Sequence, residues 1–233
     1  MVDEHAAGGD EPPACAQSDQ KQVSNVYLVG PMGVGKTTIG RLLALDLGLE
    51  FIDSDVEIEA RTGADIPWIF DVEGESGFRK RETEVIDDLS QREGVLIATG
   101  GGAILADVNR SRMAAQGVVV YLETTVDTQL KRTKRDRKRP LLRSDLPRAE
   151  QRKVLEEMKR IRDPLYQDVA HFSVFVGDVN GRTLVNTIRE RLVQDGWLPA
   201  AKLEPEPNAE PEIGQNPAPA PDKPETGEEQ DSD

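Results

Sequence analysis

Short apolar runs recur along the middle of the chain at intervals that suit buried strands. Residues 26–29, 95–98 and 118–122 are almost continuously apolar, which is typical of parallel strands with both faces covered. Residues 49–52 and 171–176 add two further runs of strand length. Longer stretches with helical spacing lie between these runs. Strands that alternate with helices predict an α/β fold, in which a parallel sheet is sandwiched by helices.

Two of the intervening stretches have a clear apolar face of helical period. The first covers residues 36–47, and Gly48 follows at a position where helices commonly end. The last covers residues 182–194. The residues that we expect to point inward are Ile39, Leu42, Leu43 and Leu47 in the first helix, and Leu184, Val185, Ile188, Leu192 and Val193 in the last.

The gap between the second and third strands is long for a single crossover. It contains roughly forty residues, whereas most connections between elements are much shorter. We therefore predict that residues 56–93 form an inserted helical subdomain. The residues that share one helical face within it are Phe78, Val85, Ile86 and Leu89.

A phosphate-binding motif precedes the first helix. Residues 30–37, Gly-Pro-Met-Gly-Val-Gly-Lys-Thr, match G-x-x-x-x-G-K-[ST], in which backbone N–H groups wrap the phosphates of a nucleotide. Lys36 would reach the β- and γ-phosphates, and the Thr37 hydroxyl would bind Mg²⁺. Chance alone produces such a match in roughly one chain in a hundred of this length. The strand before and the helix after are the arrangement that the motif needs, so we predict a nucleotide site.

Two acids follow the second strand. Asp53 and Asp55 would lie at the carboxyl end of a parallel strand, where α/β proteins bind ligands. On an extended chain, residues two apart point the same way. Asp55 also precedes an apolar helical pattern, so it could instead be a helix N-cap, or one acid could cap while the other acts on a ligand.

Two other features allow a structural as well as a functional interpretation. Arg79 is compatible with an ordinary exposed helix arginine that pairs with Glu75 or Glu82. Residues 99–102, Thr-Gly-Gly-Gly, follow the third strand and could form a simple turn. Glycines at a strand end also let backbone N–H groups approach a small ligand closely.

A basic run lies between the fourth and fifth strands. Residues 131–140 read Lys-Arg-Thr-Lys-Arg-Asp-Arg-Lys-Arg-Pro, a composition compatible with nucleic-acid binding. No aromatic residues are interleaved to stack on bases, however. Beside a P-loop, a basic loop can close over the triphosphate and supply an arginine to the transferring phosphoryl group. We favour this lid function over a nucleic-acid patch.

The net charge of −14 comes almost entirely from the two ends of the chain. Residues 1–24 contribute −4 and residues 203–233 contribute −9, which leaves −1 for residues 25–202. Both ends have few large apolar side chains, so we predict disordered tails at residues 1–22 and 201–233. Cys15 is the only cysteine, and neither a membrane-spanning run nor a signal-peptide pattern is found. These features predict a cytoplasmic protein.

The motifs, taken together and in this order, resemble shikimate kinases. Agreement in order and spacing extends over residues 25–195 and is far more specific than the P-loop alone. The segments that carry the resemblance are residues 30–38, Asp53-Ser54-Asp55, residues 70–79 (Phe-Asp-Val-Glu-Gly-Glu-Ser-Gly-Phe-Arg), residues 98–102, Lys-Arg-Pro-Leu-Leu at 138–142 and Arg-Asp-Pro-Leu-Tyr at 162–166.

The resemblance implies a P-loop kinase fold with a five-stranded parallel sheet, similar to nucleoside monophosphate kinases. The kinase domain would span residues 23–200, with residues 56–93 as the substrate-binding insertion and residues 134–148 as a mobile lid. The implied activity is ATP-dependent phosphorylation of the 3-hydroxyl of shikimate, a step of the chorismate and aromatic amino acid pathway. ATP and Mg²⁺ are the implied cofactors.

The resemblance also implies a role for each of the motif residues. The residues that would hold the nucleotide phosphates are Gly33, Val34, Gly35, Lys36, Thr37, Thr38 and, from the lid, Arg139. Thr37 would ligate Mg²⁺, and Asp53 would act on the ion through its water shell. Asp55 would hydrogen-bond the ring hydroxyls, with Lys36, Asp55 and Arg139 as the catalytic groups. The remaining substrate contacts would be Arg79 and Arg162 to the carboxylate, the Gly101 backbone, and Phe70 and Phe78 on the apolar side.

Two alternative functions stay open at this point. The chain could be a related P-loop kinase that acts on gluconate or a nucleoside monophosphate, although the arginine pair favours a carboxylic acid. It could also be a nucleotide-dependent nucleic-acid-binding protein that uses the basic run. For the kinase we expect a monomer whose partners are shikimate and ATP, with no nucleic-acid or membrane partner.

Overall fold

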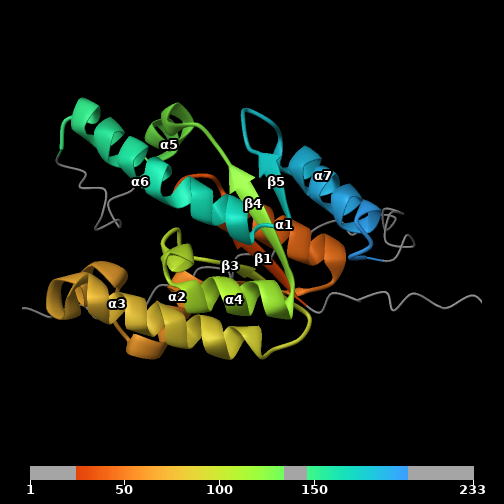
Figure 1. Cartoon of the computed structure of the whole chain (residues 1–233), viewed down its shortest axis with the longest axis horizontal. Coiled ribbons are helices and arrows are strands. Elements are labelled where there is room, and N and C mark those ends of the chain that lie inside the picture. The colour runs from red at the N-terminus through yellow and green to blue at the C-terminus, as the bar shows by residue number, and fades with distance from the viewer. Residues whose placement is uncertain (1–24, 134–145, 199–233) are drawn as a thin grey trace, which may run out of the picture. The chain divides into compact units, whose positions relative to one another are not determined.

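The computed structural model describes residues 25–133 and 146–198, and Figure 1 shows how their elements are arranged. The chain divides into two units, Met1–Leu203 and Glu204–Asp233, and all described residues belong to the first. Most of the predicted lid, including Arg139, lies outside the described residues.

Five parallel strands form the middle layer of this unit. They lie in the order β2-β3-β1-β4-β5, and every neighbouring pair is parallel. Each agrees with a predicted run to within one residue at either end, so the predicted parallel α/β sheet is confirmed. The strands are β1 (Val26–Val29), β2 (Glu50–Asp53), β3 (Val95–Ala98), β4 (Val118–Glu123) and β5 (Phe172–Phe175).

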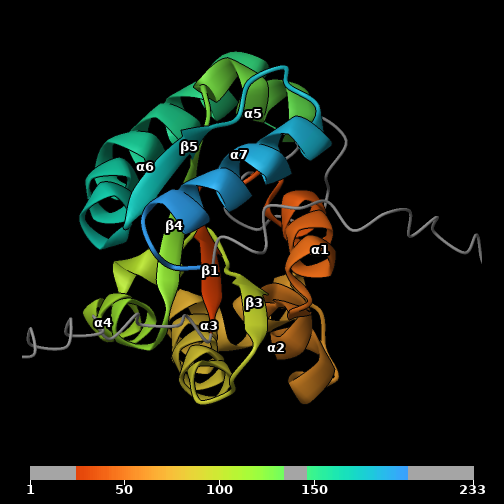
Figure 2. The same ribbon diagram turned by 90° about the vertical axis from the view of Figure 1, so that its right-hand side faces the viewer.

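Helices cover both faces of the sheet (Figures 1 and 2). Because both faces are covered, side chains on either side of β1 are buried: Val26 and Leu28 on one face, Tyr27 and Val29 on the other. The helices are α1 (Lys36–Leu47), α2 (Ser54–Thr62), α3 (Ile66–Ser90), the 3₁₀ turn η1 (Ala103–Leu105), α4 (Asp107–Gln116), α5 (Val126–Thr133), α6 (Arg148–Val169) and α7 (Gly181–Gln194).

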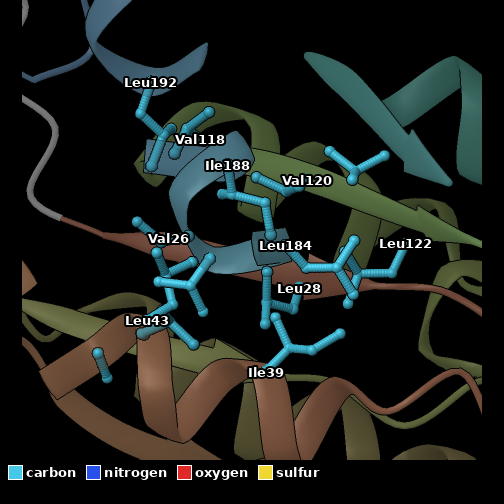
Figure 3. Packing of buried hydrophobic residues seen from close by; sticks show 14 of the residues in the cluster. Val26, Leu28, Ile39, Leu43, Val118, Val120, Leu122, Leu184, Ile188 and Leu192 are labelled. Carbon is cyan, nitrogen blue, oxygen red and sulfur yellow. The ribbon is translucent and has the colours of Figure 1, made fainter. Parts of the chain in front are cut away.

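One face of the sheet packs against α1 and α7 (Figure 3). Helix α1 lies close to the strands, since a Cβ on Gly40 would come within 2.6 Å of the Phe51 ring. The predicted inward faces are largely correct, but Leu42 is 40% exposed and Val193 only half-buried. Leu42 lies against Gly181 at the start of α7, at the border of the packed face.

The opposite face packs against α2, α3, α4 and α6. Helices α2 and α3 fill the long interval between β2 and β3, and the apolar face predicted within that interval is buried. Helix α3 is bent at Gly74, whose φ of 71° is a left-handed conformation that favours glycine. The carboxylate of Glu73 accepts two hydrogen bonds from Arg81 across this bend, at 2.7 and 2.8 Å. Within residues 25–133 and 146–198, no helix is long and apolar enough to cross a membrane.

Candidate active site

The carboxyl ends of three adjacent strands bring the predicted motifs together. Strands β2, β3 and β1 are neighbours in the sheet, and each runs directly into one of the motifs. The loop after β3 is tied to β1, because both the N–H and the hydroxyl of Thr99 donate to the Leu28 carbonyl at 3.1 and 3.2 Å. The crevice at this edge of a parallel sheet is where α/β proteins bind their ligands.

The P-loop leads from β1 into the N-terminus of α1. Gly35 caps the helix at φ 106°, a backbone conformation that residues other than glycine rarely adopt. The Lys36 ammonium folds back on the loop and donates to the carbonyls of Gly30 and Pro31 at 2.7 and 3.0 Å. Val34 has its side chain in the core and Thr38 is exposed, so only the backbone of Val34 can serve a phosphate.

An arginine of the basic run also contacts the P-loop. The Arg132 guanidinium of α5 donates to the carbonyls of Val34 at 2.9 Å and of Gly177 at 3.1 Å. It therefore links the P-loop to the segment between β5 and α7. In the sequence this arginine is only one charge in a basic run, with no signal for a contact to the P-loop.

The first acid after β2 is both a helix cap and a partner of the P-loop. The Asp53 carboxylate accepts from the Thr37 hydroxyl at 2.7 Å and from the Asp55 N–H at 3.1 Å, which makes it the N-cap of α2. The interpretation of Asp55 as the cap is therefore wrong. The expectation that both acids point the same way along an extended chain also fails, because the helix begins at Ser54.

The oxygen atoms of Thr37 and Asp53 fit Mg²⁺. Mg²⁺ prefers oxygen ligands and is commonly held by one or two side chains together with substrate phosphates and water. No group of three or more His, Cys, Asp or Glu side chains forms a complete cage in the parts of the chain that the structure describes. A site of two protein oxygens beside a P-loop is consistent with an ion that arrives with a nucleotide.

Two carboxylates meet over the first glycine of the loop after β3. A Cβ on Gly100 would lie 2.6 Å from Asp55 Oδ1 and 2.6 Å from Glu82 Oε1, so these oxygens face the same small space. The Glu82 side chain, on α3, is only 1% exposed. Burial raises its pKa from 4.5 to about 7; the charges of Arg79 and Arg162 oppose this shift, and Asp55 adds to it.

Two arginines flank this glycine loop. Arg79 is 19% exposed, donates to Glu82 at 2.7 Å and to Glu75 at 3.0 Å, and lies where a Cβ on Gly102 would clash. Burial is the largest single effect and would lower its pKa, but the charges and hydrogen bonds of Glu82 and Glu75 together outweigh burial and raise it. Arg162, on α6, is 9% exposed and donates to the Gly101 carbonyl at 3.2 Å. Arg79 is thus more enclosed than an ordinary surface helix arginine.

A buried tyrosine also holds the glycine loop. The Tyr166 hydroxyl donates to the Gly101 carbonyl at 2.5 Å, and its ring stacks on Tyr121 with 4.9 Å between centroids. Burial raises the pKa of Tyr166, so the hydroxyl stays protonated as a donor. Among the described residues, none accepts a hydrogen bond from the N–H of Gly101 or Gly102. These two N–H groups are therefore available to a ligand.

An aromatic pair lies beside Arg79. The rings of Phe70 and Phe78 lie 4.8 Å apart, and the Arg79 guanidinium lies over the Phe78 ring at 5.2 Å. Both rings come from α3, on either side of its bend at Gly74. The structure thus brings together every predicted site residue that it describes.

Sequence reasoning gave no site role to Glu82 or Tyr166. The sequence indicates Glu82 only as a possible ion-pair partner of Arg79, and Tyr166 only as the last residue of a motif. The spacing of Glu82 three residues after Arg79 was one available signal. A second was the place of Tyr166 one helical turn after Arg162, on the same face of α6.

Comparisons with known proteins agree on one family. The family model described as shikimate kinase matches residues 32–193. A shikimate kinase of Vibrio cholerae is 55% identical over 168 residues, which are 72% of this chain and 94% of that protein. One of Photobacterium profundum is 56% identical over 164 residues, or 70% and 91% of the two chains.

Solved structures give the same result. Shikimate kinase from Acinetobacter baumannii in complex with shikimate is 48% identical, with a TM-score of 0.71 and coverage of 75% of this chain and 96% of that one. The enzyme from Aquifex aeolicus is 35% identical, with a TM-score of 0.62 and coverage of 73% and 97%.

Proposed function

The chain belongs to the shikimate kinase family, and from this premise we propose how its residues carry out the ATP-dependent phosphorylation of shikimate. The observation that carries the proposal is the meeting of half-buried Arg79, buried Arg162 and Asp55 around residues 100–102, next to the P-loop. A carboxylate and several hydroxyls on one small ring match this set of groups.

The P-loop and the N-terminus of α1 would hold the ATP phosphates. Backbone N–H groups of residues 33–38 would surround them, and the Lys36 ammonium would move from the loop carbonyls to the β- and γ-oxygens. Thr37 and Asp53 would hold Mg²⁺, Asp53 through water. When bound, the ion offsets negative charge on the β- and γ-phosphate oxygens.

The acceptor would bind against the glycine loop. Arg79 and Arg162 would hold the shikimate carboxylate in two guanidinium forks, and the N–H of Gly101 would donate to the substrate. Phe70 and Phe78 would cover the apolar side of the ring. Helices α2 and α3 would thus be the substrate-binding insertion, because Asp55, Arg79 and both phenylalanines belong to them.

Asp55 would orient the attacking hydroxyl. Phosphoryl transfer requires in-line geometry and leaves little covalent chemistry to the protein, so orientation is the main contribution of such a group. The new bond joins the 3-oxygen of shikimate to the γ-phosphorus, while the bond from that phosphorus to the β–γ bridging oxygen breaks. Asp55 would accept the hydroxyl proton late in this exchange.

Arg139 is proposed as the lid arginine on the transferring phosphoryl group. The support is its position in the basic run that follows α5, and it lies outside the described residues. Arg132 reaches the P-loop from the same run, so the run starts beside the nucleotide site.

We also propose that the enzyme works as a monomer in the cytoplasm. All groups assigned to the site come from a single chain, and the sequence has one cysteine, as is common in reducing compartments. Light scattering after size exclusion should give the 25.7 kDa of one chain with shikimate and ATP present. A dimer under these conditions would contradict the proposal.

The deciding experiment is a coupled ADP-release assay on a panel of acceptors. Shikimate should support turnover, whereas gluconate and nucleoside monophosphates should not, and quinate should be a poor acceptor. Preferred turnover of gluconate or of a nucleotide would overturn the assignment. A gel-shift assay at low and moderate salt tests the nucleic-acid alternative, since binding driven by phosphates weakens steeply with salt.

A further inference from the structure

We propose that shikimate binding is coupled to the uptake of one proton by Glu82, which acts as a positioning residue for Arg79 and Asp55. This inference rests on shikimate being the acceptor, and it goes beyond that function by linking substrate affinity to pH through one buried side chain. Glu82 lies in the middle of α3, with its side chain 1% exposed.

Charged groups from three helices face this carboxylate. Asp55 comes from α2, Arg79 precedes Glu82 by three residues on α3, and Arg162 comes from α6. Tyr166 of α6 is a further titratable group near the cluster, and burial keeps its hydroxyl protonated. Asp163 of α6 lies close enough to act on Tyr166, and Glu75 of α3 pairs with Arg79. The loop of residues 100–102 adds only backbone to this space.

The enclosed charges of this cluster balance without a substrate, because the carboxylates of Asp55 and Glu82 stand against the guanidinium groups of Arg79 and Arg162. Glu75 also pairs with Arg79, but its side chain is 52% exposed, so water solvates much of its charge. The carboxylate of shikimate would add a third negative charge to an enclosed site with two positive ones. Uncompensated buried charge is unfavourable, and a buried acid responds by taking up a proton.

Glu82 is the acid best placed to accept that proton. Its Oε2 accepts from Arg79 at 2.7 Å, whereas its Oε1 has no hydrogen-bond partner among the described residues. Oε1 faces the same space as the carboxylate of Asp55, so a protonated Oε1 could donate to it. Burial already raises the pKa of Glu82 to about 7, and the negative charge of a bound substrate carboxylate would raise it well above that.

Protonation of Glu82 would also release Arg79 for the substrate. The Arg79 guanidinium is shared between Glu82 and Glu75, and a substrate carboxylate would compete with them. A neutral Glu82 attracts the guanidinium less strongly than an ionised one. The proton comes from the buffer, ends on the Glu82 carboxyl group, and is returned when the product leaves.

The expected pH dependence has a definite sign. Below about pH 6 Glu82 is already protonated in the free enzyme, so this group should not change shikimate affinity. Above pH 7 a proton must be taken up, and affinity should fall by up to about tenfold per pH unit. Between pH 7 and 8.5 we expect a loss of roughly tenfold.

Calorimetry of shikimate binding counts the protons directly. Titrations of the full chain at pH 8, in buffers of different ionisation enthalpy, should show uptake of close to one proton per shikimate. Glu82→Gln should take up none, and its affinity should be flat from pH 6 to 8.5. Glu75→Gln is the matched control, because Glu75 pairs with the same arginine but is 52% exposed, so its proton count should equal that of the wild type.

The wild-type measurement decides the proposal even if Glu82→Gln does not fold. A wild-type proton count near zero at pH 8, or the same count in a folded Glu82→Gln variant, would overturn it. Failure of the assigned function has a different signature, namely the absence of shikimate-dependent ADP release. An enzyme that turns over shikimate without proton uptake keeps its function and contradicts only this inference.

Discussion

At the scale of single residues, two acids of similar chemistry lie side by side and differ in surroundings. Asp55 lies at the start of α2, and its neighbour Asp53 already caps that helix. Glu82 lies in the middle of α3 and is almost fully enclosed. The helix cap therefore does not depend on the Asp55 carboxylate, so a change of this side chain need not destabilise the start of α2.

Asp55→Asn should separate function from stability. The variant keeps the size of the side chain and loses the charge, so the free energy of unfolding should stay within about 1 kcal/mol. We expect kcat/KM for shikimate to fall at least roughly a hundredfold, or ~2.7 kcal/mol. Glu57→Gln, two residues further along α2, is the control. Normal turnover by Asp55→Asn would remove Asp55 from the reaction.

The two arginines of the site should contribute to the affinity for shikimate and not to the affinity for ATP. Arg79→Ala and Arg162→Ala should each weaken shikimate binding by about 2–5 kcal/mol, because a carboxylate in an enclosed site loses one guanidinium partner. ATP affinity, measured by fluorescence of a nucleotide analogue, should be nearly unchanged. Arg191→Ala on the surface of α7 is the control. A selective loss of ATP affinity would contradict the assignment of these arginines to the shikimate carboxylate.

Glu82→Gln should change the pH dependence of stability. The pKa of Glu82 is about 7 in the folded chain and 4.5 in the unfolded one, so the folded state binds the proton more tightly. Stability contributed by this group is therefore lost as pH rises from about 4.5 to 7. In urea unfolding, the advantage of Glu82→Gln over wild type should grow by about 2 kcal/mol between pH 5.5 and 8. A pH-independent difference would show that Glu82 does not titrate there.

At the scale of elements, three helices converge on the short loop after β3. Helix α2 supplies Asp55, α3 supplies Arg79, and α6 supplies Arg162 and Tyr166. Side chains fill the positions beside Gly100 and Gly102, so neither glycine can be replaced without displacing a site residue. The loop is therefore more than a turn, because its small size lets charged groups from separate helices meet.

Tyr166→Phe tests how far α6 positions this loop. Loss of the hydroxyl leaves the Gly101 carbonyl with Arg162 alone, so the KM for shikimate should rise by about 5- to 10-fold, in line with one buried hydrogen bond. The KM for ATP should not change. Tyr121→Phe is the control, since its hydroxyl donates to Asp163 and not to the loop. Equal effects of both variants on shikimate KM would contradict the role of Tyr166.

The strands and the P-loop could be predicted from the sequence because their signals are local. A parallel strand buried on both faces is a short apolar run, and the glycine pattern of a P-loop follows from close backbone approach to phosphate. The enclosed position of Glu82 was not predicted, and the sequence left open which of the two acids after β2 caps the helix. Both depend on where α3 and α2 lie relative to the glycine loop, and such tertiary placement has no short-range signal.

The bend in α3 also escaped prediction. The sequence predicted a helical subdomain over residues 56–93 with one apolar face from Phe78 to Leu89, and Gly74 alone does not indicate where a helix changes direction. The bend depends on a left-handed glycine and on the Glu73–Arg81 ion pair across it. It places Phe70 against Phe78, and a straight helix would carry these rings, eight residues apart, along its axis.

At the scale of the whole molecule, the assigned activity is contained in one central part of the chain. The packed core clusters and every assigned site residue that the structure describes lie between Val26 and Leu198. The acidic charge lies mainly outside this part, since residues 1–24 and 203–233 contribute −4 and −9 of the −14. Residues 25–202 carry a net charge of only −1, so the charges of the site are balanced by groups within this part of the chain.

Removal of residues 1–22 and 203–233 should leave catalysis and stability nearly unchanged. These segments have little apolar surface, so they can add little to a hydrophobic core. We expect the melting temperature to shift by less than about 2 °C and kcat/KM for shikimate to stay within about twofold.

Each end should be removed separately and then together, with the salt dependence of shikimate KM measured in every case. The acidic C-terminal segment could affect an anionic substrate only through long-range charge, which 0.5 M salt would screen. A drop in melting temperature on removing either end would show that it packs on the kinase domain, which would contradict the predicted boundaries.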